Sequence, residues 1–114
     1  MARVEHPKSP IVSKLEGLHL FHFDGAPCAQ RVRFALYEKG LVRGREIKFD
    51  ADDPGSCAGE QGAWVSRHVS LVKKDHMTDA YSQIQPNLVV PALVHDGELY
   101  IESMDIVEYL DEAF

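Results

Sequence analysis

The apolar positions near the start of the chain predict a strand followed by a helix. Residues 18–23 (LHLFHF) form a short, apolar and aromatic run, which is typical of a buried strand. After a turn at 24–26, Pro27 favours the first turn of a helix, and Gly40 is a common residue just past a helix end. Between them an apolar stripe recurs at helical spacing, formed by Cys28, Val32, Ala35 and Leu36. The pattern therefore predicts a helix that ends at about residue 39.

The middle of the chain is less regular. Residues 46–49 indicate a second strand, and residues 51–62 are rich in small residues and turn formers. Two apolar tracks then recur at helical spacing and predict a second helix: Trp64, His68 and Leu71 on one, Val65, Val69 and Val72 on the other. Thr78 or Asp79 can cap a further short helix, which Pro86 would end.

The last part of the chain predicts a hairpin and a helix. Residues 92–94 and 99–101 indicate two strands, with a turn at 95–98 between them. Ser103 is a plausible N-cap for a helix whose apolar residues recur at helical spacing. The order is β-α-β-α-β-β-α, which predicts an α/β fold with a four-stranded mixed sheet and flanking helices. Since a helix joins the first two strands, they should be parallel.

Composition and charge narrow the class of protein. The chain has 114 residues, enough for one domain, which we place at 17–114 after a flexible lead-in at 1–16. Its net charge of -6 argues against nucleic acid as a partner, because phosphate binding needs clustered Lys and Arg. No apolar run is long enough to span a membrane, and the N-terminus lacks the apolar stretch of a secretory signal. We therefore expect a cytoplasmic protein.

Three segments together resemble a known family. They are APCAQRVRFALYEKGL at 26–41, VVPALVHDG at 89–97 and LYIESMDIVEYLDEAF at 99–114. In this order they are similar to the N-terminal, glutathione-binding domain of the glutathione S-transferase superfamily, bacterial type, over residues 18–114. The resemblance implies a thioredoxin-like fold, glutathione as co-substrate, thiol transfer to an unknown electrophile, and a homodimer in the full-length form.

The resemblance also implies where glutathione binds. The Val90-Pro91 bond would be cis, so that Val90 offers its N–H and C=O to the cysteinyl part of the peptide. Ser103 would hold the γ-glutamyl carboxylate at a helix start, and Glu102 the α-amino group. From the residues alone, a trans proline opening a strand and an ordinary helix cap with an exposed acid remain open. Many members have Gln where this chain has Val89, which puts affinity or orientation in question.

The residue that meets the glutathione thiol is a separate question. The family uses Tyr, Ser or Cys there, and residues 20–27 contain none of the three. Cys28 matches the Cys of beta-class transferases and of zeta-like reductive dehalogenases, and a thiolate at a helix start is stabilised by free N–H groups, to which Arg31 would add. Cys28 also fits the apolar stripe as an inert residue, and backbone N–H groups alone are a third possibility. Cys57 is interpreted as a bystander.

Three further expectations complete the sequence interpretation. The six histidines lack the spacing of a metal site and should be surface or half-buried. Lys73, Lys74 and His76 are candidates for the glycine carboxylate of glutathione, but a solvated charged turn explains them equally well. The family normally adds a helical C-terminal domain, which is absent up to Phe114, so the chain is either an excised or a freestanding domain. Alternative functions are thiol-disulfide exchange or reductive dehalogenation through Cys28, or a non-catalytic interaction module.

Overall fold

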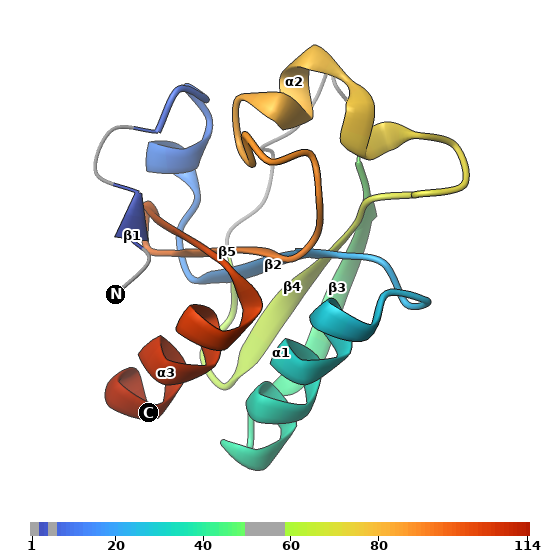
Figure 1. The fold of residues 1–114 in the computed structure, drawn as a ribbon. Coiled ribbons are helices and arrows are strands. Elements are labelled where there is room, and N and C mark those ends of the chain that lie inside the picture. Colours follow the sequence, from blue (N-terminus) through green and yellow to red (C-terminus); the bar gives the residue numbers. More distant parts are fainter. Residues whose placement is uncertain (1–2, 5–6, 50–58) are drawn as a thin grey trace.

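The fold is a six-stranded mixed sheet with helices on both faces (Figure 1). The computed structural model describes residues 3–4, 7–49 and 59–114. The strands are β1 Arg3–Val4, β2 Leu18–His22, β3 Val42–Lys48, β4 Ala63–His68, β5 Ala92–His95 and β6 Glu98–Ile101. The helices are η1 Val12–Lys14, α1 Pro27–Glu38, η2 Asp75–Met77, α2 Asp79–Ser82 and α3 Ser103–Ala113, where η marks a 3-10 helix. Across the sheet the order is β1-β6-β5-β2-β4-β3.

The expectation of a mixed α/β architecture is confirmed, but the expected four strands are wrong because the sheet has six. One added strand is β1, which lies in the lead-in at 1–16 and pairs antiparallel with β6. The other is β4, which lies where a helix was expected. Strands β2 and β3 each pair in parallel with β4, which lies between them. The two strands joined by α1 are therefore parallel, as predicted, but they are not neighbours.

Strand β4 replaces the start of the helix expected over residues 64–72. Residues Trp64 to Arg67 are all buried, because β2 and β3 flank the strand and both faces of the sheet are covered. A strand buried on both faces loses the alternation of apolar and polar residues. Its apolar residues Trp64 and Val65 are adjacent rather than alternating, and together with Val69 and Val72 they fit helical spacing.

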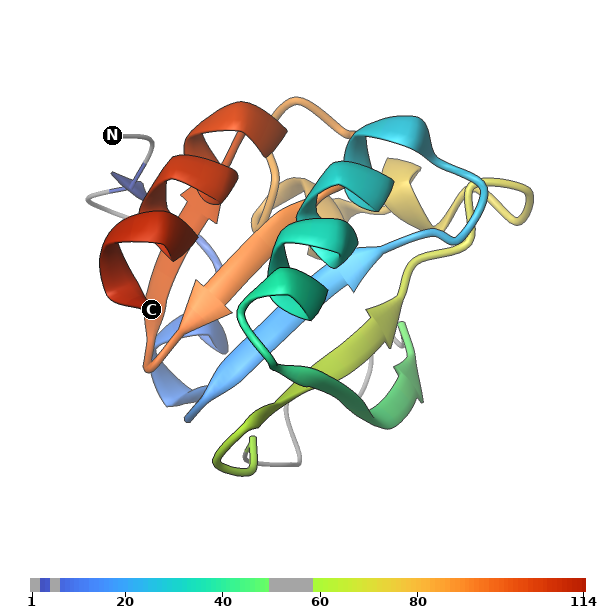
Figure 2. The ribbon, with the colours of Figure 1, turned by 90° about the horizontal axis from the view of Figure 1, so that it is seen from below.

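Two apolar cores lie on opposite faces of the sheet. Helices α1 and α3 lie side by side and cover one face (Figure 2), where Leu36, Ile106 and Leu110 are fully buried. Helix α2 and the segment around η1 lie on the other face (Figure 1), where Val12 and Tyr81 join the second core. Burial of these apolar side chains is the main source of stability in a domain of this size.

The predicted first helix, hairpin and last helix are confirmed, but the predicted N-cap Ser103 of the last helix is wrong by one residue. Helix α1 begins at Pro27, and Gly40 follows its end with a φ of 75°, a conformation that glycine adopts without strain. Strands β5 and β6 pair antiparallel around a turn at 96–97. Helix α3 begins at Ser103 itself, so Glu102 occupies the N-cap position, one residue before the predicted one. Among the helices of the described residues, none is long and apolar enough to cross a membrane.

Candidate functional site

One pocket brings together five of the residues that the sequence singled out for glutathione: Cys28, Val90, Pro91, Glu102 and Ser103. It has a volume of about 200 Å³ and lies where α1 and α3 begin and the chain enters β5. The described residues that line it are Cys28, Gln85, Val89, Val90, Pro91, Glu102 and Ser103. The structure thus places a thiol, a strand edge and a helix start around one hollow.

The side chain of Cys28 faces this pocket and is exposed. Cys28 is the second residue of α1, after the N-cap Ala26 and Pro27. The first hydrogen bond of the helix runs from the Gln30 N–H to the Ala26 carbonyl, so the N–H of Cys28 is a free donor of the helix start. The interpretation of Cys28 as part of the buried stripe is wrong, although Val32 does belong to that stripe.

Arg33 holds the turn that leads into α1. Its Nη1 donates to the Phe23 carbonyl at 3.2 Å and its Nη2 to the Asp24 carbonyl at 3.0 Å. Asp24 in turn accepts from Arg43 of β3 at 3.1 Å, and this contact, as the largest cause, holds the pKa of Asp24 below its usual value. The turn before Cys28 is therefore tied both to α1 and to the edge strand of the sheet.

A buried histidine lies beneath the same turn. His22 is fully buried, its Nε2 lies 2.6 Å from the Ser66 hydroxyl, and its Nδ1 accepts from Arg33 at 3.1 Å. Burial lowers the pKa of His22 to about 4, and the charges of Arg43 and Arg33 act in the same direction. The expectation of surface or half-buried histidines is therefore wrong for His22, and also for His19, which is fully buried.

The segment before β5 presents a short strand edge to the pocket. The Val90-Pro91 bond is cis, as the resemblance implied. The Tyr81 hydroxyl donates to the Val89 carbonyl at 2.7 Å, and Gln85 Nε2 donates to the Pro91 carbonyl at 3.4 Å. Hydrogen bonds among the described residues leave the N–H and C=O of Val90 unpaired. That pair of groups is what an extended peptide needs in order to bind along the edge.

The start of α3 forms the opposite wall. Ser103, the first residue of the helix, is nearly buried, and Glu102 before it is exposed with a φ of 70°. The first N–H groups of a helix lack partners within it and attract anions. A carboxylate acceptor and a helix start thus lie side by side, which suits a ligand group that carries both charges.

Other candidate residues lie outside this pocket. Lys73 and Lys74 are exposed, and His76 is half-buried with an Nδ1 that has no hydrogen-bond partner among the described atoms. None of the three is among the described residues that line the pocket. Cys57 lies outside the described residues. Over the part of the chain that the structure describes, no three histidine, cysteine or acidic side chains are grouped to hold a metal ion.

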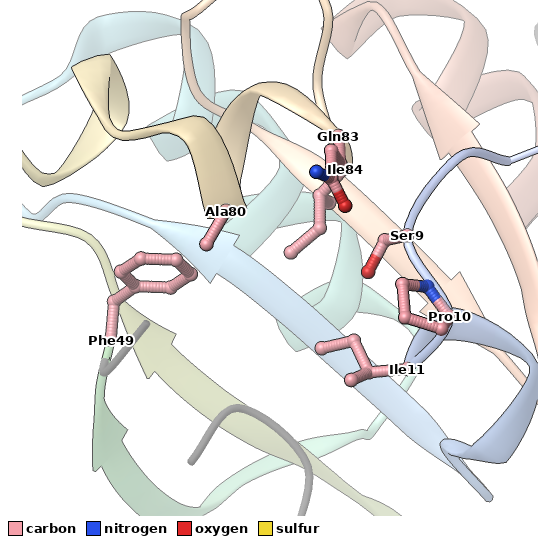
Figure 3. A pocket seen from close by; sticks show the side chains of 7 residues that line it. All are labelled: Ser9, Pro10, Ile11, Phe49, Ala80, Gln83 and Ile84. Atoms are coloured by element: carbon pink, nitrogen blue, oxygen red, sulfur yellow. The ribbon is translucent and has the colours of Figure 1, made fainter. Parts of the chain in front are cut away.

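A second hollow lies on the α2 face of the sheet and differs in character. Its volume is about 140 Å³. Figure 3 shows the side chains that line it, which are Ser9, Pro10, Ile11, Phe49, Ala80, Gln83 and Ile84. Most of them are apolar, and none of the five predicted site residues is among them. We therefore take the pocket at Cys28 as the candidate site.

The sequence interpretation missed three residues that support this site. Arg33 was overlooked in favour of Arg31, which is exposed. Gln85 and Tyr81 were assigned no role, although both hold the segment before β5. The only sequence signal for Gln85 is a polar side chain directly before Pro86, at the end of a short helix.

Comparisons with known proteins show the family of this chain. A model of the family described as "Glutathione S-transferase, N-terminal domain" matches residues 20–114. Glutathione S-transferase 1 of Dianthus caryophyllus is 30% identical over 102 residues, which are 90% of this chain and 37% of that protein. Glutathione S-transferase Z1 of Arabidopsis thaliana is 33% identical over 100 residues, 87% of this chain and 35% of that protein. The chain thus spans about a third of the length of these relatives.

Solved structures show the same fold. The beta-etherase LigF from Sphingobium sp. strain SYK-6 superposes with a TM-score of 0.63 and 29% identity, over 85% of this chain and 31% of that one. A maleyl pyruvate isomerase, described as a bacterial glutathione S-transferase of the zeta class, gives a TM-score of 0.63 and 26% identity over 84% of this chain and 35% of that one. The fold is therefore the thioredoxin-like fold of these proteins, and the chain belongs to the glutathione S-transferase N-terminal domain family.

Proposed function

We propose that this domain binds glutathione in the pocket at Cys28. The whole protein would join the thiol sulfur of glutathione to an electrophilic substrate. The observation that carries the proposal is the pocket itself. Five residues chosen from the sequence, at positions 28, 90, 91, 102 and 103, line one hollow of about 200 Å³. From the family resemblance we extend the proposal to a homodimer of the full-length protein and to a cytoplasmic location.

The cysteinyl and γ-glutamyl parts of glutathione each have a matching surface in the pocket. The cysteinyl residue would pair with the N–H and C=O of Val90, in the way an added strand binds a sheet edge. The γ-glutamyl carboxylate would lie at the free N–H groups and hydroxyl of Ser103. The α-ammonium group would lie against the Glu102 carboxylate. In this pose the glutathione sulfur would lie toward the start of α1, where Cys28 is exposed.

A second candidate function, thiol-disulfide exchange, is favoured by the exposure of Cys28 at a helix start. The Cys28 thiolate would attack one sulfur of oxidised glutathione, form a mixed disulfide and release the other half as glutathione thiolate. The free N–H groups of α1 would stabilise the attacking thiolate.

Titration of the chain with reduced glutathione, followed by amide NMR, tests the first proposal. We expect the largest shifts at Ala29, Val90 and the first turn of α3, and saturation at millimolar ligand. Ser103→Ala should weaken binding, whereas Ser82→Ala, a matched change on the exposed side of α2, should not. Shifts scattered over the surface, or equal affinities for the two variants, would refute the site.

Intact mass after incubation with oxidised glutathione tests the second. One glutathione adduct is expected in the native chain, and peptide mapping should place it at Cys28 rather than Cys57. Cys28→Ser should remove it and Cys57→Ser should retain it. A Cys28 that stays unmodified at pH 8 would exclude disulfide exchange and leave glutathione binding intact as a proposal.

A further inference from the structure

A short chain of hydrogen bonds joins the two walls of the pocket through residues that follow α2. Gln85 is 1% exposed, and its Nε2 donates to the Pro91 carbonyl at 3.4 Å. Its Oε1 accepts from the N–H of Asn87 at 3.1 Å. Asn87 Nδ2 in turn donates to Glu102 Oε1 at 3.1 Å. We refer to Gln85 and Asn87 as the clasp.

The clasp lies where the pairing of β5 with β6 ends. The last residue pair between β5 and β6 toward the pocket is Ala92 with Ile101. Pro91 and Glu102 are the next residues on the two segments, and here the ladder of backbone hydrogen bonds ends. The clasp bridges them by side chains instead, so it fixes the spacing of the two walls where the sheet no longer does.

The contact with Glu102 has a directional consequence. A carboxylate has two oxygens, each with acceptor capacity on more than one side. Asn87 and Glu102 are both exposed, and the hydrogen bond from Asn87 to Oε1 favours one orientation of the carboxylate and leaves Oε2 free for a second donor. Glu102 is exposed, and without this restraint its side chain would sample several rotamers in water. The restraint therefore preorganises a cation acceptor beside the start of α3.

We propose that the clasp is a positioning device that makes the site select peptides carrying a free α-ammonium group next to a carboxylate. This inference rests on the proposed glutathione site and adds to it the residues that set selectivity. Asn87 orients the acceptor for the ammonium, and Gln85 keeps the Pro91 segment at the matching distance. Neither residue is assigned a direct contact with a reacting atom.

The test compares two ligands that differ by one group. Glutaryl-cysteinylglycine lacks only the α-amino group of glutathione, so the ratio of the two dissociation constants isolates the contribution of that group. The native chain should favour glutathione. In Asn87→Ala this preference should fall by roughly fivefold, which corresponds to about 1 kcal/mol. Gln83→Ala, an exposed change four residues away, should keep the native ratio.

A second variant separates selectivity from folding. Gln85→Met keeps the length of the side chain but removes both of its hydrogen bonds. It should weaken both ligands, because it loosens the strand edge that both use. Thermal unfolding of each variant gives the independent measure of stability. If the ratio of the two dissociation constants changes while the thermal midpoint stays constant, the substitution acts on ligand selectivity and not on folding.

The outcomes distinguish the two proposals. A native chain that binds neither ligand would overturn the glutathione site and the clasp with it. A native chain that prefers glutathione, together with an Asn87→Ala variant that keeps the same preference, would overturn the clasp alone. A reduced preference in Asn87→Ala, with Gln83→Ala unchanged, supports it.

Discussion

Acidification from pH 7 to pH 5 should destabilise the domain, because two buried histidines must stay neutral in the folded state. His19 and His22 are fully buried, and burial is the largest cause that lowers the pKa of each to about 4. In both rings Nδ1 accepts from an arginine, Arg67 for His19 and Arg33 for His22. Nε2 of His19 lies 2.7 Å from the Glu16 carbonyl, so it must carry the ring proton.

The sign and size of the effect follow from proton linkage. The unfolded chain binds protons at both histidines below an ordinary pKa of 6.5, whereas the folded protein binds them only near pH 4. The contribution of the two neutral histidines to the free energy of unfolding is therefore fully present above pH 6.5. It is lost as the pH falls from 6.5 to about 4. At ~1.36 kcal/mol for each unit of pKa, the limit is about 3.4 kcal/mol for each histidine. Between pH 6 and 5, where nearly two protons separate the two states, the slope should reach ~2.5 kcal/mol per pH unit.

Urea unfolding at pH 7, 6 and 5 measures this slope directly. The slope is proportional to the number of protons by which the unfolded and folded states differ. His19→Gln and His22→Gln should each lower this number by about one, whatever they do to the stability at pH 7. The imidazole nitrogen spectrum at pH 5 should show both rings neutral, with the proton on Nε2. A slope below about one proton between pH 6 and 5, or a charged ring at pH 5, would refute the assignment of two buried neutral histidines.

Three further substitutions test other parts of the structure. Leu110→Ala should cost roughly 2–5 kcal/mol in urea unfolding, because the side chain is fully buried between α3 and the sheet, and a cost below that range would contradict this packing. Thr78→Ala should cost about 1 kcal/mol, since the Thr78 oxygen accepts the Tyr81 N–H at the start of α2, and an unchanged stability would exclude that cap. Arg33→Met should slow formation of the glutathione adduct at Cys28, because the turn before α1 loses its donors, and an unchanged rate in the mass assay would show that Arg33 does not position the thiol.

The elements that could be predicted from the sequence are those with local signals. Pro27 and Gly40 bracket α1, and Asp96-Gly97 forms the turn of the hairpin, where both residues have positive φ. These signals depend on the φ that proline fixes and glycine permits, so they act within a few residues. Strand β4 has such a signal only at its start, where Gly62 has a φ of 80°, and its burial on both faces removes the alternation that marks a strand.

The exposure of Cys28 could also have been read from helix geometry. Successive residues turn by about 100°, so a step of four residues overshoots a full turn by about 40°. The stripe from Cys28 through Val32 to Leu36 therefore drifts across the surface of the helix. Val32 and Leu36 face the sheet and α3, and Cys28 lies at the edge of the stripe and in the first turn, where it meets the pocket. The sequence pattern overestimated how wide a buried face this helix has.

The supports of the site could not be predicted, because each joins residues that are distant in sequence through polar groups. Arg33 reaches back to residue 24, Tyr81 reaches forward to 89, and Asn87 reaches 102. A polar side chain carries no periodic signal for its partner, and its choice of partner is made only after the sheet has brought the segments together. The residues that touch the ligand thus follow from short motifs, whereas the residues that orient them follow from the register of β5 with β6 and the position of α2. Selectivity in this domain should therefore change through substitutions at Gln85 and Asn87, which lie outside the three segments by which the family is recognised.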